Sequence, residues 1–132
     1  MLARLLTLAW IGLAALSPSA GLSPPAGAAE GSAAPYDRDL QRLAEILGSL
    51  HYLRALCGAN EGPKWRNEMQ ALVDAETQGG DRRDKLIAGF NRGYRGYQQT
   101  YRTCTPAANL VIRRYLDEGA RISRDITARY AN

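Results

Sequence analysis

Apolar residues recur at every third or fourth position through four successive segments, and this spacing constrains the fold more than any other feature. It is clearest in the segment after Gly79-Gly80, where one stripe continues up to a cysteine. The stripe consists of Leu86, Phe90, Tyr94, Tyr97, Tyr101 and Cys104. Residues three and four apart share one face of an α-helix. Because no segment shows the sustained alternation that is typical of a β-strand, the chain is predicted to be all-α.

Glycine and proline residues divide the chain into four predicted helices. Pro63 and Pro106 suit the first turn of a helix, where a missing N–H group would be unpaired anyway. Gly58 and Gly79-Gly80 follow the last periodic residues of the helices before them, where glycine readily ends a helix. The predicted helices span residues 37–57, 63–77, 81–104 and 106–130, and the expected capping residues at helix starts are Asp37, Asp81 and Thr105. Short turns favour antiparallel neighbours, so we expect a compact antiparallel four-helix arrangement.

The last predicted helix has two distinct faces. The apolar face is expected to be buried and consists of Ile112, Leu116, Ile122, Ile126 and Tyr130, with Gly119 between them. The other face carries charges of alternating sign at every fourth position: Arg113, Asp117, Arg121, Asp125 and Arg129. Such pairs stabilise a helix by about 0.2–0.5 kcal/mol each, and we expect this face to be exposed to solvent.

The first 28 residues have the features of a cleavable export signal. Arg4 supplies a short positive start, residues 5–16 form an apolar run, and residues 26–28 have the A-x-A form that signal peptidase accepts. The apolar run is shorter than the roughly 20 residues that a membrane span needs. We therefore expect a signal peptide at 1–28, a flexible tether at 29–35 and a single helical domain at 36–132. The domain is expected in the periplasm without stable membrane insertion, and an uncleaved N-terminal anchor is the alternative.

Cys57 and Cys104 lie at the predicted C-terminal ends of the first and third helices. In an up-down-up arrangement these two ends meet at the same end of the bundle, so the predicted topology brings the thiols together. A disulfide there would close a loop of about 48 residues and, in the chain-entropy model, stabilise the fold by about 4 kcal/mol. We expect one structural disulfide, with two separately buried thiols as the alternative if export fails.

Other uses of the two cysteines fit the sequence less well. Zinc sites take three or four protein ligands, and the chain offers two cysteines and one histidine, His51. A thioredoxin-type redox pair has C-x-x-C spacing, which this pair lacks. We therefore expect no metal site and no cofactor.

The formal net charge of +4 at pH 7 comes almost entirely from arginine, since Lys64 and Lys85 are the only lysines. A mild positive balance favours an acidic protein surface or another anionic component of the cell envelope as a partner. It is too small to indicate a nucleic-acid partner. A solvated, arginine-rich surface without a specific partner is the favoured interpretation of this charge.

Tyrosine and arginine alternate around the third predicted helix over residues 89–102. The same stretch contains Gly89, Gly93 and Gly96. Each glycine costs a helix up to about 1 kcal/mol relative to alanine, so the three indicate close approach by another helix, near Gly48 or Gly119. A compatible interpretation is an exposed face that binds a partner, because tyrosine and arginine are enriched at binding hot spots. The candidate partner-binding residues are Tyr94, Arg95, Tyr97, Tyr101 and Arg102.

No set of residues in the sequence indicates an enzyme. His51 could act as a general base, but a lone histidine in the middle of a helix more often packs or faces solvent. The paired carboxylates are explained by helix starts and by the charged face of the last helix, and the remaining helical acids stand alone: Glu45, Glu68 and Glu76. We predict no catalytic residue, although a Ser-His-Asp set assembled in space stays open.

Residues 36–65 and 90–106 resemble a family of small exported alphaproteobacterial proteins of unknown function. The stretches that carry the resemblance are YDRDLQRLAEILGSLHYLRALCGANEGPKW and FNRGYRGYQQTYRTCTP. The family is marked by two well-separated cysteines, suggested to be disulfide-linked, and Cys57 and Cys104 occupy their places. It has no assigned catalytic residues. The resemblance therefore implies the compartment and the bond and leaves the activity open.

These features favour a non-enzymatic periplasmic protein that supports the envelope or binds a partner there. The alternative is an enzyme or ligand-binding protein that acts on cell-wall glycan. It would use His51 or a glutamate in a cleft between helices, so it requires a hollow in which polar groups converge.

Overall fold

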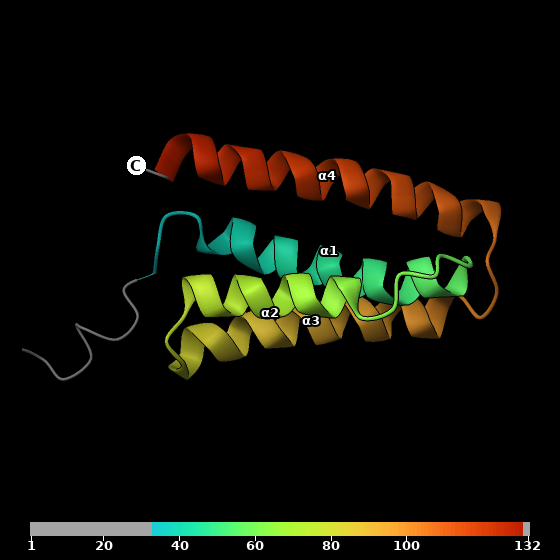
Figure 1. The fold of residues 1–132 in the computed structure, drawn as a ribbon, viewed down its shortest axis with the longest axis horizontal. Helices are drawn as coiled ribbons and strands as arrows, with labels where there is room; N and C mark the ends of the chain where they lie inside the picture. Colours follow the sequence, from blue (N-terminus) through green and yellow to red (C-terminus); the bar gives the residue numbers. More distant parts are fainter. Residues whose placement is uncertain (1–32, 131–132) are drawn as a thin grey trace, which may run out of the picture.

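Four helices pack together in the computed structural model, which describes residues 33–130. They are α1 (Asp37–Leu56), α2 (Lys64–Glu76), α3 (Gly80–Thr100) and α4 (Pro106–Tyr130). Consecutive helices run in opposite directions (Figure 1), so the predicted all-α, antiparallel four-helix arrangement is confirmed. The predicted signal peptide at 1–28 and most of the tether at 29–35 lie outside the described residues.

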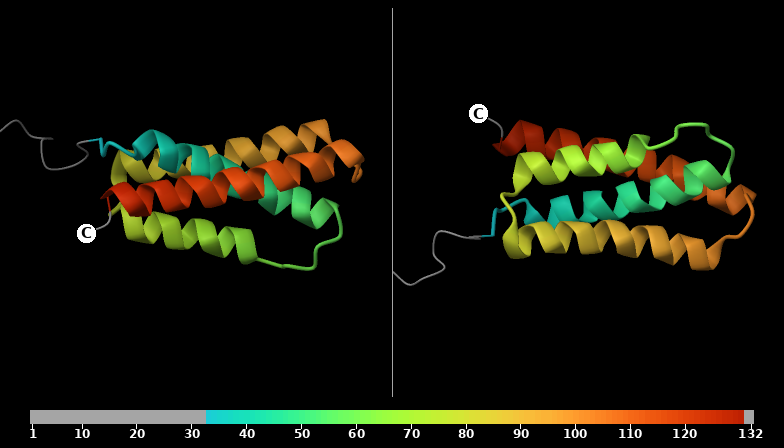
Figure 2. Two further views of the ribbon diagram at one scale, coloured as in Figure 1. Left: turned by 90° about the horizontal axis from the view of Figure 1, so that it is seen from above. Right: turned by 60° about the horizontal axis from the view of Figure 1, so that its bottom comes forward.

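Both ends of the described chain lie at one end of the molecule (Figure 2), where the rings of Tyr36 and Tyr130 are 5.0 Å apart. Within residues 33–130, no helix has the length and apolar character needed to cross a membrane.

Helix α1 is the central element of the fold. It packs against each of the other three helices, whereas no Cα atom of α4 lies within 8 Å of one in α2 or α3. Residues on several sides of α1 are therefore buried: Leu40, Ala44, Ile46, Leu47, Gly48, Ser49, Leu50 and Leu53. One hydrophobic cluster joins α1 to Met69, Val73, Leu86 and Phe90, and a second joins α1 to Ala108 and Ile112 of α4.

Glycine residues allow α1 and α3 to approach closely, as the sequence predicted. A Cβ atom added to Gly48 would overlap the backbone carbonyl of Phe90. A Cβ atom on Gly93 would overlap the carbonyl of Glu45 and lie 2.7 Å from the Ser49 hydroxyl. Gly96, in contrast, has no described atom outside the neighbouring backbone of α3 within 4 Å of such a Cβ position. The alternative contact, Gly119 with α3, is wrong, because Gly119 faces α1.

The predicted helix starts are correct to within one residue, but two of the three expected caps are wrong. Tyr36 precedes α1, and the Asp37 carboxylate instead accepts a hydrogen bond from the Ala34 N–H (2.9 Å). Gly79 precedes α3 with a φ of 103°, so the chain turns into the helix through glycine rather than through an Asp81 cap. The third cap is confirmed, since Thr105 Oγ1 accepts the N–H of Ala108 at 3.1 Å.

The C-terminal end of α3 differs from the prediction. The helix ends at Thr100, Tyr101 is extended (φ −120°), and Cys104 lies in the connection to α4 rather than in a helix. Two interactions tie this connection to α1. The Tyr52 hydroxyl donates a hydrogen bond to the Tyr101 carbonyl, and Cys57 is bonded to Cys104.

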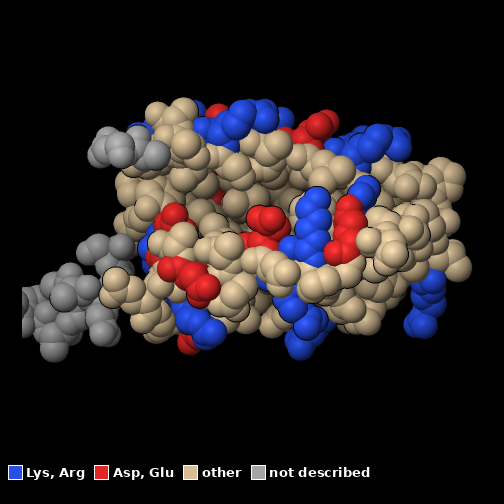
Figure 3. All heavy atoms as spheres, viewed as in Figure 1, with Lys and Arg blue, Asp and Glu red and all other residues tan. Residues whose placement is uncertain are grey.

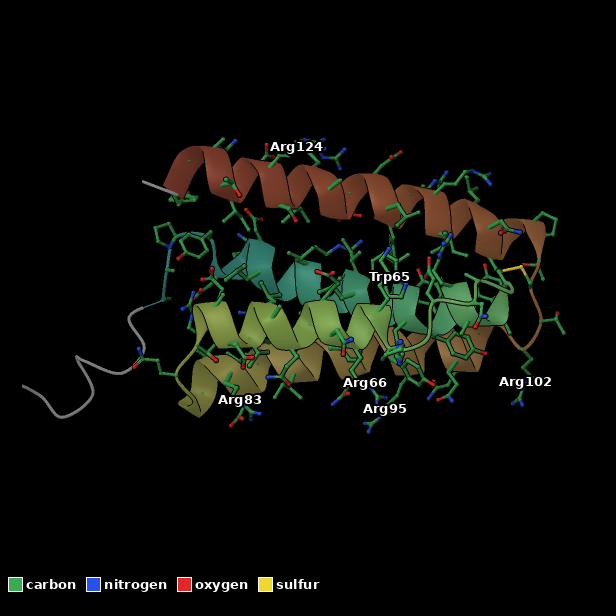
Figure 4. All side chains as sticks on the ribbon, in the orientation of Figure 1. Trp65, Arg66, Arg83, Arg95, Arg102 and Arg124 are labelled. Atoms are coloured by element: carbon green, nitrogen blue, oxygen red, sulfur yellow. A yellow bond between two sulfur atoms is a disulfide. The ribbon has the colours of Figure 1, made fainter. Side chains whose placement is uncertain are left out.

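The predicted disulfide between Cys57 and Cys104 is confirmed. The two Cα atoms lie 4.9 Å apart, and the sulfur–sulfur bond is visible at the end of the molecule opposite the termini (Figure 4). The bond joins the end of α1 to the α3–α4 connection. It thereby helps to fix the position of α4, whose backbone approaches that of α1 alone among the described helices.

Glu61 holds the α1–α2 connection in place. Its carboxylate pairs with Arg54 at the end of α1 and accepts a hydrogen bond from the Trp65 indole at 2.6 Å. The hydrogen bond from Arg54, followed by that from Trp65, lowers the pKa of Glu61 from 4.5 to about 2. The charged form of Glu61 is therefore favoured by the fold.

Replacing Glu61 with glutamine is expected to reduce the free energy of unfolding at neutral pH by about 1 kcal/mol, because a partly exposed charge-assisted pair is lost. A group with a lowered pKa stabilises the fold above its unfolded pKa, near 4.5, and loses that effect as the pH falls through about 2. Urea unfolding of both proteins should show their difference shrinking over this range. Glu68→Gln is the control, because it removes an exposed carboxylate that has no ion-pair partner among residues 33–130. A difference that did not depend on pH would contradict the assignment.

Candidate functional site

Two hollows of different chemistry flank α2. The first, about 250 Å³ in volume, lies between α1, α2 and α3 and is lined mainly by polar side chains. The second, about 310 Å³, lies between α1, α2 and α4 and is mainly apolar. We call them the cationic cleft and the apolar groove.

The cationic cleft draws its lining from three helices. Its residues are His51, Arg66, Phe90, Asn91, Tyr94, Arg95 and Gln98. His51 from α1 is half-buried, and its ring lies 5.9 Å from Phe90 and 5.6 Å from Tyr94 between ring centres. Arg66 from α2 and Arg95 from α3 are exposed. The cleft thus combines a partly buried aromatic side with charged groups that reach solvent.

Arg66 and Arg95 differ from the arginines that hold the fold together. Arginines with carboxylate partners are Arg42, Arg54, Arg82 and Arg92. Arg66 and Arg95 have no carboxylate partner within residues 33–130 and point away from the helices on the same side of the molecule (Figure 4). Arg83 and Arg102 project on that side as well. No carboxylate lines the cleft, so its positive charge is not neutralised by the described part of the protein.

The environment of His51 disfavours a second charge beside the arginines. Partial burial, and then the positive charge of Arg66, lower the pKa of His51 below its usual 6.5. The neutral form of His51 is therefore favoured, and the two guanidinium groups carry the charge of the free cleft. An anion placed between them would remove the repulsion that keeps the imidazole neutral.

The five candidate partner-binding residues of the sequence do not form one continuous face. Tyr94 and Arg95 line the cationic cleft. Tyr97 and Tyr101 lie toward α4, and Arg102 follows the end of α3 and is exposed. The tyrosine stripe is therefore divided between a hollow and a packing contact, and only the first part adjoins unpaired arginines.

Tyr97 and Tyr101 fill the space between α3 and α4. The Tyr97 ring stacks on Tyr101 (6.2 Å between centres) and meets the edge of Tyr115 (5.7 Å), and the Tyr97 and Tyr115 hydroxyls are hydrogen-bonded at 2.8 Å. Burial, and then this hydrogen bond, raise the pKa of Tyr97. Arg42 lies 5.0 Å above the Tyr115 ring and binds both carboxylate oxygens of Glu118, at 2.7 and 3.0 Å. These contacts give Tyr97 and Tyr101 a role in packing.

The apolar groove exists because no helix within residues 33–130 covers one side of α4. Leu116, expected in the core, is 37 % exposed and lines the groove with Trp65 of α2 and Leu47 of α1. In Figure 3 the groove is the recessed, largely tan region between α4 above and α2 below. Tyr130, also expected to be buried, is 40 % exposed. The charged face of α4 is exposed as predicted.

The described residues bring no second catalytic group to His51. Glu45 pairs with Arg42 and Arg92, Glu76 pairs with Arg82, and Glu68 lines the other hollow. Within residues 33–130 there is also no group of three histidine, cysteine, aspartate or glutamate side chains placed to hold a metal ion. The chemistry that the cleft offers is hydrogen-bond donation to an acidic group.

Sequence reasoning missed Arg66, Asn91 and Gln98. Asn91 and Gln98 belong to the tyrosine- and arginine-rich stretch, where the spacing of 3 and 4 from Tyr94 places them on one helix face. Arg66 gives no such signal, because it comes from α2 and reaches the cleft only through the packing of α2 beside α3.

Comparison with known proteins identifies one family. The model of a family described as "Protein of unknown function (DUF2385)" matches residues 35–130. No curated protein and no solved structure matches the chain.

Proposed function

The chain belongs to the DUF2385 family of proteins of unknown function, and from its cleft we propose a non-enzymatic interaction protein of the periplasm that binds an acidic component of the cell envelope. The observation that carries this proposal is a hollow whose lining holds two arginines without a carboxylate partner in the described part of the chain, and no acidic side chain. A periplasmic location rests on the predicted signal peptide at 1–28. An exported protein with a structural disulfide suits an oxidising compartment.

Charge and geometry support binding at the cleft rather than a diffuse surface attraction. Arg66 and Arg95 come from different helices, so the packing of α2 against α3 sets their separation. Guanidinium groups suit bidentate hydrogen bonds to acidic oxygens. The Asn91 and Gln98 amides provide further donors beside them. These groups can select a ligand by shape as well as by charge.

We expect the purified domain to co-sediment with envelope fractions of the native cell. The double variant Arg66→Gln/Arg95→Gln should weaken this binding by about tenfold or more, because one charge-assisted hydrogen bond contributes about 1.5–3 kcal/mol. Arg121→Gln/Arg129→Gln on α4 removes the same net charge and should bind like the wild type. Equal losses in the two variants, or no sedimentation of the wild type, would overturn the proposal. Cell fractionation and sequencing of the mature N-terminus test the location.

The second candidate, action on cell-wall glycan, has partial support. The cleft between helices that it requires is present and contains His51 and the exposed part of Tyr94, a ring on which a sugar could stack. The carboxylates that glycoside hydrolysis uses lie elsewhere on the described domain. The cleft thus favours binding of an acidic saccharide over its cleavage. Release of soluble fragments from purified cell wall would favour the enzyme instead.

A further inference from the structure

The donors of the cationic cleft outnumber the acceptors that a carboxylate can offer. Each guanidinium carries five N–H donors, and the Asn91 and Gln98 amides carry two each. A carboxylate has one charge and two oxygens. A phosphate monoester carries between one and two negative charges near neutral pH and three strong acceptor oxygens. The two positive charges of the free cleft match the phosphate better.

Resting on the function proposed above, we propose that the cationic cleft binds a phosphate monoester group between Arg66 and Arg95, and that His51 becomes its third cationic contact by taking up a proton on binding. The ligand would be either a phospholipid whose headgroup is a phosphate monoester, as in phosphatidic acid, or a soluble phosphate monoester, since both present the same group. The site then favours the phosphate dianion, and the affinity for that dianion increases as the pH falls toward the range in which His51 titrates, while the ligand's own second pKa, about 6, reduces the amount of dianion present.

The position of His51 supports its part in the site. The imidazole lies against the rings of Phe90 and Tyr94, so its orientation is set by packing. The charged and titratable groups that line the cleft with it are Arg66 from α2 and Tyr94 and Arg95 from α3, and none of them is an acid. In the free protein, burial and Arg66 both oppose protonation. An anion bound in the cleft would instead favour the protonated form of His51.

Binding and protonation are then linked in both directions. A phosphate that raises the pKa of His51 must bind more tightly to the protonated protein by the corresponding factor. An opposite charge within about 4–6 Å typically shifts a pKa by one unit or more. We therefore expect saturating phosphate to raise the pKa of His51 by about one unit, and the affinity for the phosphate dianion, after correction for the ligand's own protonation, to increase up to about tenfold at acidic pH.

The chain allows a direct test, because His51 is its only histidine. The imidazole protons of the purified, oxidised domain give one set of NMR signals, which can be titrated between about pH 5 and 8. Inorganic phosphate should raise the pKa of His51, and an equal ionic strength of acetate should raise it much less. Arg66→Gln should raise the pKa in the free protein, because repulsion is removed, and abolish the further rise with phosphate. Arg113→Gln on α4 is the matched control.

The outcomes separate this inference from the broader proposal. If phosphate does not move the pKa of wild-type His51, or moves it equally in Arg66→Gln, the phosphate site is wrong. Envelope binding that still depends on Arg66 and Arg95 would then leave the proposed function standing with another acidic ligand. If phosphate binds, glycerol 3-phosphate and vesicles containing phosphatidic acid distinguish the two sources. If neither glycerol 3-phosphate nor the vesicles bind, the assignment of a phosphate monoester as ligand is wrong.

Discussion

Replacing Gly93 with alanine is expected to lower the free energy of unfolding by about 3 kcal/mol, the upper end of what overpacking usually costs. The new Cβ atom would overlap the Glu45 carbonyl and lie 2.7 Å from the Ser49 hydroxyl. The Glu45 carbonyl belongs to the backbone of α1 and cannot move by a side-chain rotation, so α3 must shift away from α1. This contact is the most extensive between any two helices of the fold. Urea unfolding followed by circular dichroism measures the loss.

Gly96→Ala is the matched control for this prediction. Gly96 lies one turn further along α3, and an added Cβ atom would have no neighbour within 4 Å. Because alanine is the better helix former, this variant should be more stable than the wild type by about 0.5–1 kcal/mol. A glycine-to-alanine substitution is thus expected to lower the free energy of unfolding at position 93 and to raise it at position 96. Equal stability of the two variants would show that α1 and α3 are not in the described contact.

Removing the disulfide has the other large expected effect. The double variant Cys57→Ser/Cys104→Ser should lose about 4 kcal/mol of stability, since the denatured chain regains the freedom of a loop of about 48 residues. For a domain of this size, that corresponds to a fall in Tm of more than about 15 °C. The loss is a large fraction of the roughly 5–15 kcal/mol that stabilises a typical domain. Thermal unfolding of the oxidised wild type and the variant tests it.

A reductant provides the internal control for the disulfide. It should lower the Tm of the wild type to near that of the double variant and leave the variant unchanged. If the variant does not fold well enough to study, reduction of the folded wild type gives the same comparison. A variant within about 1 kcal/mol of the wild type would contradict a structural role for the bond, because it lies far below the loop-closure value.

The helices themselves were largely predictable, because their signals are local. Apolar spacing, first-turn prolines and glycines at helix ends act within one or two turns of the chain. The error at the end of α3 has a tertiary cause. The apolar stripe continues through Tyr101 to Cys104, but the helix ends at Thr100, and a hydrogen bond from Tyr52 and the bond to Cys57 tie the following segment to α1.

The extent to which neighbouring helices bury each apolar face was not predictable from local sequence signals. Leu116 lies on the apolar face of α4 but is 37 % exposed, because the backbone of α4 approaches only that of α1 among the described helices and α2 stays too far away to cover this side chain. Periodicity identifies the side of a helix that is apolar. It does not say how many neighbours that side will have, which depends on the lengths and positions of the other helices.

The sequence by itself determined the all-α class, four helix positions and a cysteine pair at one end of an antiparallel arrangement. All of these follow from spacing and turn chemistry along the chain. Only the tertiary structure decided which glycines carry the α1–α3 contact, which tyrosines are used in packing, and that Arg66 lies beside His51 and Arg95. Each of these relations joins residues on different helices. The relative position of helices is set by side-chain packing between them, and a single sequence does not show which side chains pack together.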